Sequence, residues 1–147
     1  MGIRTVRTEG DECLRKVCKP VKSVSLRTRI LIEDMFDTMY ESGGVGLAAP
    51  QIGVLKRIVV MDTDDNQHVL INPQILEFSE VTSLGEEGCL SVPNQRAQVE
   101  RAQVIRVLYH TLEGDVMETT FEGFPARIVQ HEVDHLNGIL FVDRLKA

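Results

Sequence analysis

The pattern His-Glu-Val-Asp-His at residues 131–135 constrains the fold more than any other feature of this chain. On a helix, two histidines four residues apart project from one face, where both can bind the same metal ion. The glutamate between them, Glu132, is then placed to take a proton from a water molecule on that metal. Pro125 suits the first turn of such a helix, and Gly138 can end it after Asn137. We therefore predict a metal-binding helix near the end of the chain.

The two faces of this helix are expected to differ. At about 100° per residue, the apolar residues share one arc, which we predict to be buried: Ile128, Val129, Val133 and Leu136. The opposite arc is predicted to face solvent, and it carries Arg127, Gln130, Asp134 and Asn137. Both histidines and Glu132 lie on or beside the buried arc, where ionisable groups are costly unless a metal or catalysis requires them. The alternative is a chance pattern whose histidines make local hydrogen bonds.

The length of 147 residues fits one domain, and we expect that domain to span residues 1–147. The net charge of −6 disfavours a general nucleic-acid binder, so we predict no direct nucleic-acid binding. No apolar stretch reaches the length of a bilayer span, and residues 1–10 do not have the pattern of a signal peptide. Three widely spaced cysteines do not make a disulfide framework, which favours the reducing cytoplasm. Cys13 and Cys18 are most simply small core or surface residues.

The hydrophobic pattern predicts an α+β fold. Apolar residues recur at helical spacing over 26–42, with Ser25 as a candidate N-cap and Gly43 at the end. Short strands are predicted afterwards at 57–61, 68–71, 104–109 and 116–121, with turns at 64–66 and 113–115. Residues up to Val24 are expected to form an extended or irregular segment. One early helix, a run of strands and one late helix differ from the alternation of a parallel α/β fold.

Two histidines leave a metal site incomplete, and Cys89 is a candidate third ligand. Flanking glycines in the segment 85–91 let the backbone come close to a bulky neighbour. A thiolate and two imidazoles would leave a fourth position open, as in catalytic metal sites. A lone cysteine is more often a small buried hydrophobe, and spacing alone cannot join Cys89 to His131. His68 and His110 have polar neighbours in strands, so surface positions are expected for both.

A second unusual segment is rich in small residues and covers 44–53. It permits a close approach of its backbone to a ligand or to the metal-binding helix. Gln51 supplies an amide donor that could stabilise a developing oxyanion. The glycines match neither a phosphate loop nor a dinucleotide fingerprint. A close-packed turn is the alternative for this segment taken alone.

Together, three segments resemble the peptide deformylase family. They are Gly-Val-Gly-Leu-Ala-Ala-Pro-Gln at 44–51, Glu-Gly-Cys-Leu-Ser at 87–91 and Gln-His-Glu-Val-Asp-His-Leu-Asn-Gly at 130–138. Further similarity lies at 14–21, 70–73 and 138–141, so the resemblance covers nearly the whole chain. It implies antiparallel β-sheets packed around a central metal-binding helix, with the predicted N-terminal helix in addition.

The resemblance also implies a function. It predicts a metal-dependent hydrolase that removes the N-formyl group from the N-terminal formyl-methionine of newly made proteins and releases formate. The metal would be one divalent ion, with Fe²⁺ expected in the cell and Zn²⁺ or Ni²⁺ in preparations. A thiolate among the ligands is compatible with iron or zinc, so the ligand set does not choose between them. The implied partners are N-formyl-methionyl peptides and nascent chains in the cytoplasm.

The roles implied for matching positions divide into three groups. The metal ligands would be Cys89, His131 and His135. Glu132 would be the general acid/base, while Gln51 and the backbone N–H of Leu90 would receive the formyl oxygen. The substrate would contact Gly44, Val45, Gly46, Arg96, Phe124, Arg127 and Ile128, the last three near the methionine side chain.

The chain departs from the family pattern at several positions. Pro125 stands where relatives usually have an aliphatic residue, which bears on the helix entry and the pocket wall. Gly10 stands where the family often has proline. The chain ends at Ala147, whereas some bacterial members continue into a longer C-terminal helix that contributes to ribosome contact. The short C-terminus therefore argues against ribosome docking. None of these departures removes a proposed ligand or Glu132.

Two other functions stay open at this stage. A zinc-dependent protease can use the same His-Glu-x-x-His chemistry, but its third ligand is generally a downstream His or Glu, and twelve residues follow His135. A non-enzymatic, metal-stabilised domain that binds peptide termini is the second alternative. Glu132 and Gln51 argue against that alternative because a binding module needs neither.

Overall fold

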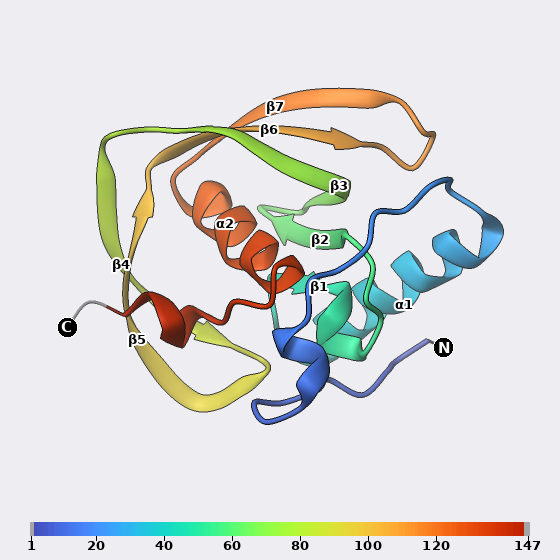
Figure 1. Ribbon diagram of the computed structural model, residues 1–147, viewed down its shortest axis with the longest axis horizontal. Helices are drawn as coiled ribbons and strands as arrows, with labels where there is room; N and C mark the ends of the chain where they lie inside the picture. Colours follow the sequence, from blue (N-terminus) through green and yellow to red (C-terminus); the bar gives the residue numbers. More distant parts are fainter. Residues whose placement is uncertain (1, 146–147) are drawn as a thin grey trace.

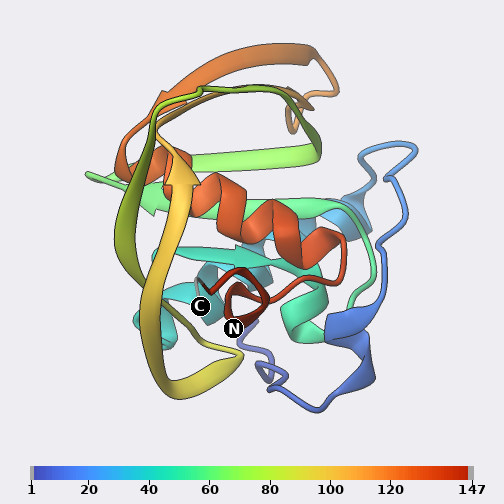
Figure 2. The same ribbon diagram turned by 60° about the vertical axis from the view of Figure 1, so that its left-hand side comes forward.

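Helix α2 (Phe124–Leu136) lies at the centre of the molecule, with strands on several sides of it (Figures 1 and 2). This computed structural model describes residues 2–145. The other elements, in chain order, are η1 (Glu12–Arg15), α1 (Leu26–Glu41), β1 (Gly46–Ala48), η2 (Ala49–Ile52), β2 (Ile58–Thr63), β3 (Asn66–Phe78), β4 (Thr82–Cys89), β5 (Val92–Ala102), β6 (Val104–His110), β7 (Val116–Glu122) and η3 (Phe141–Arg144).

All strand pairs in the two sheets are antiparallel. A five-stranded sheet has the order β1-β2-β3-β6-β7, and β4 pairs with β5 in a separate two-stranded sheet. The long strands β4 and β5 curve down one side of α2, while β2 and β3 pass along another side (Figure 1). The predicted α+β fold, with antiparallel sheets around the late helix and one early helix, is therefore confirmed.

Helix α1 begins and ends where the sequence predicted, within one residue. The side chain of Ser25 accepts a hydrogen bond from the backbone N–H of Thr28, and Gly43 follows the helix with φ of 72°. Its apolar stripe, which includes Leu31, Met35 and Met39, belongs to one core cluster with residues of β1 and β2. Packing of this stripe fixes α1 against the sheet.

The tight turn between β2 and β3 explains why their register is well defined. Asp64 and Asp65 have φ of 52° and 62°, the left-handed conformation of a two-residue hairpin turn. The predicted turn at 64–66 is thus one residue too long, since Asn66 already pairs with Thr63. Gly114, with φ of 86°, occupies the second predicted turn.

The strand predictions were incomplete. The four predicted strands correspond to β2, β3, β6 and β7, but β3 is much longer, and β1, β4 and β5 were not predicted. Strand β4 contains two glycines and two adjacent glutamates, and most of β5 is polar. Neither has an apolar alternation, because they pair with each other and contact polar side chains of α2. The N-terminal segment is mostly irregular as expected, with η1 as a short 3₁₀ turn.

The prediction of a solvent-facing arc on α2 was wrong. Arg127, Gln130 and Asp134 are all buried, and of the four predicted residues Asn137 alone is exposed, at the C-cap. Strand β5 and its neighbours cover this arc and satisfy its polar groups. The Gln130 amide, for example, accepts from the N–H of Ala102 and donates to its carbonyl oxygen. The helix is therefore buried on both arcs, with apolar packing on one and hydrogen bonding on the other.

Within residues 2–145, no helix is both long enough and apolar enough to span a membrane.

Candidate metal centre and active site

Three predicted ligands from two distant segments converge on one point. His131 and His135 project from the same face of α2, with ring centroids 5.1 Å apart. Cys89, at the end of β4, lies opposite them, and its Sγ is 3.3 Å from Nε2 of His135. One ligand atom from each of the three residues lies within 4.8 Å of the other two. Sequence spacing could not show whether Cys89 lies near the two histidines, and the fold places the three residues together.

The donor set fits a divalent transition metal. One thiol and two imidazoles supply three ligands and leave a fourth position for water or substrate, as in catalytic sites. Both histidines are buried, and burial of such groups is costly unless they are paired or bound to a metal. Beside them, Oε1 of Glu132 and Nδ1 of His135 are buried, and neither atom has a hydrogen-bond partner within residues 2–145. An unpaired carboxylate oxygen next to three converging ligands indicates a site built for a further group.

The electrostatics of the site favour positive charge. Burial lowers the pKa of His131, but hydrogen bonds to Cys89 and Glu87 outweigh burial and raise it to about 10. The pKa of His135 is held well below its ordinary value by burial and by the neighbouring His131. A location that stabilises one positive charge among a thiol and two carboxyl groups is equally suited to a metal cation.

The surroundings of Glu132 bring the pKa of its carboxyl group close to neutral pH. Burial raises its pKa to about 7; His131 opposes this shift and Glu87 adds to it. Its side chain lies against Gly46 of β1, where a Cβ atom would come within 2.8 Å of Oε2. A carboxyl group with a pKa close to the working pH can both accept and return a proton.

Gln51 and Leu90 flank the three ligands. The Oε1 atom of Gln51 accepts from the backbone N–H of Ala48, which turns its amide group toward the cleft. Its Nε2 donates to Oγ of Ser91 at 3.1 Å and lies 3.6 Å from Sγ of Cys89. Leu90 directly follows Cys89 and lines the same cleft. The side-chain amide of Gln51 and the residue Leu90 therefore border the space in front of the ligands.

A cleft of about 500 Å³ is lined by most of the site residues that the sequence predicted. All of them line it except His135, which is buried behind Cys89. Phe124 and Val45 are half-exposed at its edge. Arg96 is exposed and pairs with Glu86 across the β4–β5 sheet. The cleft is also lined by residues that the sequence did not single out: Gly43, Glu86, Gly88, Val92, Asn94 and Gln95.

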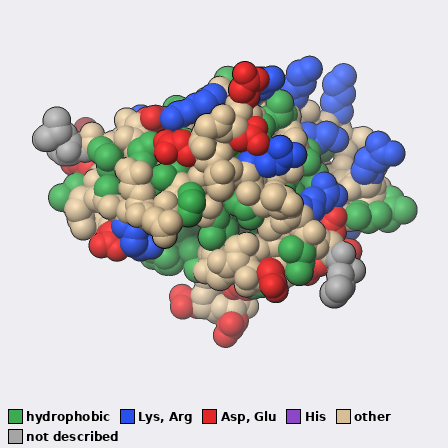
Figure 3. All heavy atoms as spheres, turned by 90° about the horizontal axis from the view of Figure 1, so that it is seen from below, with side chains coloured by type: hydrophobic (Ala, Val, Ile, Leu, Met, Phe, Trp, Pro, Cys, Tyr) green, Lys and Arg blue, Asp and Glu red, His purple; other side chains and the backbone are tan. Residues whose placement is uncertain are grey.

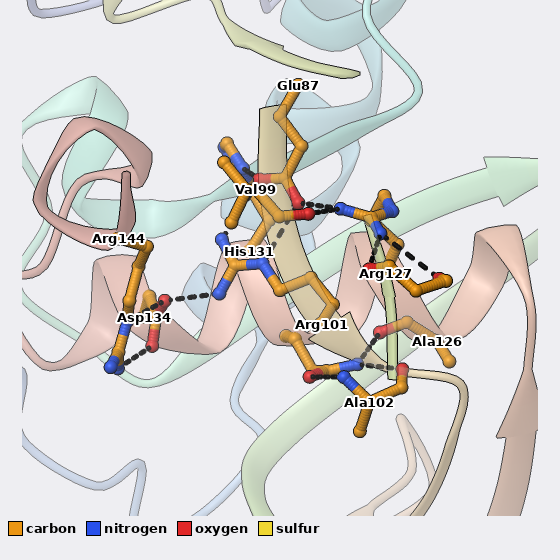
Figure 4. A network of polar contacts seen from close by, with 11 residues as sticks. Glu87, Val99, Arg101, Ala102, Ala126, Arg127, His131, Asp134 and Arg144 are labelled. Atoms are coloured by element: carbon orange, nitrogen blue, oxygen red, sulfur yellow. Dashed lines mark hydrogen bonds and ion pairs between the residues drawn. The ribbon is translucent and has the colours of Figure 1, made fainter. Parts of the chain in front are cut away.

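Glu87 is the main site residue that sequence reasoning missed. Its Oε1 accepts from Nδ1 of His131 at 2.9 Å, and its carboxylate also accepts from Arg101 and Arg127 (Figure 4). Burial raises the pKa of Glu87, but the hydrogen bonds from His131 and Arg101 dominate and lower it to about 2. With Nδ1 donating to this carboxylate, Nε2 of His131 is the nitrogen left for the metal.

Arg101 extends this network away from the cleft. Its Nη1 donates to Asp134 at 2.7 Å, and Arg144 of η3 donates two hydrogen bonds to the same carboxylate (Figure 4). Glu87 had a signal in the sequence, because it precedes Cys89 by two residues in a matched segment. Arg101 had none, since β5 was not predicted. Asp134 lies in the matched segment 130–138, but its position on the helix led us to expect it in solvent.

The other two histidines lie elsewhere. His68 packs edge-on against Phe121 at 5.6 Å between ring centroids, and Nδ1 of His110 is 3.2 Å from Nδ2 of Asn72. Both are half-buried rather than at the surface, and neither approaches the three ligands. Cys18 is buried and Cys13 half-buried, as expected for small packing residues.

Antiparallel sheets around a helix that carries two buried histidines and a glutamate are typical of a metal-dependent hydrolase. The sequence model of the polypeptide deformylase family matches residues 3–147. The peptide deformylase of Thermotoga neapolitana is 48% identical over 141 residues, which cover 96% of this chain and 86% of that protein. Peptide deformylase 1 of Clostridium perfringens is 49% identical over 146 residues, covering 97% and 98% of the two chains.

Comparison with solved structures identifies the same family. The crystal structure of the Thermotoga maritima peptide deformylase superposes with a TM-score of 0.97 at 44% identity and full coverage of both chains. The actinonin-bound class I type b enzyme of Acinetobacter baumannii gives 0.94 at 50% identity, covering 99% and 100%. The chain belongs to the polypeptide deformylase family. This family of metal-dependent enzymes removes N-formyl groups from newly made peptides, so the predicted resemblance and activity are confirmed.

Proposed function

We propose that the chain is a single catalytic domain in which Cys89, His131 and His135 hold one divalent metal ion. The proposal is supported by the convergence of their ligand atoms within 4.8 Å. For the metal itself we propose Fe²⁺ in the cell, with Zn²⁺ or Ni²⁺ able to replace it, because thiolate and imidazole ligands accept all three. Bound there, the metal supplies Lewis acidity, which lowers the pKa of water and polarises a carbonyl group.

The residues around the metal would carry the proton and charge transfers. Glu132 takes a proton from the attacking water, whose oxygen bonds to the formyl carbon. Negative charge then grows on the formyl oxygen, which Gln51 and the N–H of Leu90 stabilise by hydrogen bonds; losing one such donor costs about 3 to 4 kcal/mol. As the C–N bond breaks, Glu132 returns the proton to the amine nitrogen. The products are formate and a free N-terminus.

Substrate binding would use the remaining cleft residues. Phe124 and Ile128 offer apolar contacts to the methionine side chain, along with the aliphatic part of Arg127. Its guanidinium already donates to Glu87 and to the carbonyl oxygens of Ser83 and Val99. The peptide chain would run along Gly44, Val45, Gly46 and Arg96. The peptide deformylase of Acinetobacter baumannii has been solved with Met-Ala-Ser bound, at 47% identity and a TM-score of 0.96, which supports a peptide as the ligand. We place the reaction in the cytoplasm, on formyl-methionyl nascent chains.

The test combines substrate choice with one substitution. Formate release from formyl-Met-Ala is measured beside cleavage of the same peptide without its formyl group. We expect formate release alone, and activity restricted to the unformylated peptide would identify a protease instead.

Glu132→Gln should retain the metal, since none of the three ligands changes, and lose nearly all turnover. Metal content and formate release are measured on the same preparation, with the exposed Glu118→Gln as a control that keeps full activity. Turnover that survives in Glu132→Gln would disprove the proton-transfer role.

A further inference from the structure

The charges of this chain are unevenly distributed along the sequence. Residues 13–32 contain six Lys or Arg and no Asp or Glu, and residues 42–61 contain two and none. These two segments therefore carry a formal charge of +8, while the rest of the chain carries −14. The net charge of −6, from which we predicted no nucleic-acid binding, hides this separation.

The fold brings the two segments together. The backbone N–H of Lys19 donates to the carbonyl oxygen of Leu55, and the N–H of Arg57 donates to that of Lys19. Lys19 and Lys56 are thus bridge partners. Lys56 and Arg27 also line one surface hollow. Seen from below, Lys and Arg side chains gather on one side of the molecule (Figure 3).

Five exposed cations, which we call the basic face, are not neutralised by the protein. They are Lys16, Lys19, Lys22, Arg27 and Lys56. In the described part of the chain, none of the five forms an ion pair, whereas nearby Arg4, Arg7 and Arg15 pair with Asp34, Asp11 and Asp143. Unpaired cations spread over one surface create a local positive potential on a protein of negative net charge.

We infer that the basic face binds the phosphate backbone of folded RNA. Flexible lysines that act as point charges suit a polyanion with regularly spaced phosphates. Residues 13–32 and 42–61 contain no aromatic side chain that could stack on bases, so binding is expected to be independent of sequence.

The position of the face fits the activity of the enzyme. None of its five residues lines the catalytic cleft, so RNA bound there leaves the cleft open. The inference does not depend on the roles proposed for the cleft residues.

The test measures binding of a fluorescein-labelled RNA hairpin by anisotropy at several KCl concentrations. Three variants are compared with the wild type: Lys56→Glu, Lys19→Glu/Lys56→Glu and the matched charge reversal Arg106→Glu. Arg106 lies on β6, outside both basic segments, and is partly exposed. Formate release from formyl-Met-Ala-Ser is measured on every variant.

We expect salt-sensitive binding that weakens at least tenfold in the double variant and less than twofold in Arg106→Glu. Each lost phosphate contact lowers the slope of log affinity against log salt by about 0.9, so the double variant should lose about 2. Formate release should stay unchanged in all variants, which separates this inference from the proposed catalytic roles. Absence of RNA binding by the wild type, or equal weakening by Arg106→Glu, would overturn it. Binding to phosphatidylserine vesicles but not to RNA would assign the face to membranes instead.

Discussion

At the scale of single residues, the missing side chain of Gly46 is a tight constraint in the cleft. A Cβ atom at this position would lie 2.8 Å from Oε2 of Glu132 and 2.8 Å from Cγ2 of Ile128. Both neighbours belong to α2, whose position is fixed by packing on both arcs. Neither can therefore move away without disturbing the carboxylate.

We predict that Gly46→Ala lowers kcat/KM by roughly 10- to 100-fold, because the methyl group displaces the Glu132 carboxylate from its place in the cleft. The comparison is Gly44→Ala, whose Cβ would meet the flexible end of the Leu90 side chain at 2.9 Å. That variant should be the milder of the two in formate-release kinetics. Equal activity of Gly46→Ala and the wild type would mean that the carboxylate position is not critical.

A second prediction concerns Cys18, which is 4% exposed in the core. Burial raises the pKa of its thiol from about 9 to about 11. The folded state therefore prefers the neutral thiol, and this contribution to stability is complete below pH 9 and lost as the pH rises toward 11. Between these values the free energy of unfolding of the wild type should fall relative to Cys18→Ala by on the order of 2 kcal/mol. Urea titrations at several pH values measure this difference, and parallel curves for the two proteins would refute it.

At the scale of elements, α2 is held on one arc by the β4–β5 sheet through ionic hydrogen bonds. Arg101 of β5 joins two carboxylates, Glu87 and Asp134, and Glu87 in turn orients His131. Both partners of Arg101 and its own side chain are buried. A change in β5 is therefore expected to reach the metal site although Arg101 touches no proposed ligand.

We predict that Arg101→Met lowers the metal affinity about tenfold or more, because the carboxylate that orients His131 loses two of its donors. It should also lower the free energy of unfolding by about 3 to 5 kcal/mol, since two buried carboxylates each lose a partner. Metal titration of the folded variant and urea denaturation measure the two effects. Arg106→Met, which removes exposed ion pairs, should change the free energy of unfolding by less than about 1 kcal/mol. Unchanged metal affinity in Arg101→Met would show that the network is structural alone.

The same elements show what the sequence could predict. In helix α1 and in strands β2, β6 and β7, apolar residues recur at a regular spacing that marks the buried face. The bounds of these elements were therefore predicted to within a few residues. Strands β4 and β5 bury polar groups against polar groups, for instance Glu87 with Arg101, and such pairs leave no periodic signal. The assumption that a charged arc faces water failed at Asp134 for the same reason. Cys89 was predicted as a metal ligand from the family resemblance. Sequence spacing could not reveal its contact with the histidines, because that contact depends on the fold of β4.

At the scale of the whole molecule, the proposed metal site depends on the packing of the β4–β5 sheet against α2. Cys89 and His135 are 46 positions apart in the chain, so no local structure brings their side chains together. We propose that this packing makes one cation site from one sulfur and two nitrogen atoms.

X-ray absorption at the metal edge, on protein purified without oxygen, tests this arrangement of ligands. We predict one metal ion per chain with one sulfur and two nitrogen neighbours. In the zinc-substituted protein the sulfur should lie at about 2.3 Å and the nitrogens at about 2.0 to 2.1 Å. In Cys89→Ser, the sulfur neighbour should disappear while the two nitrogen neighbours remain. A wild-type spectrum without a sulfur neighbour would show that Cys89 does not bind the metal.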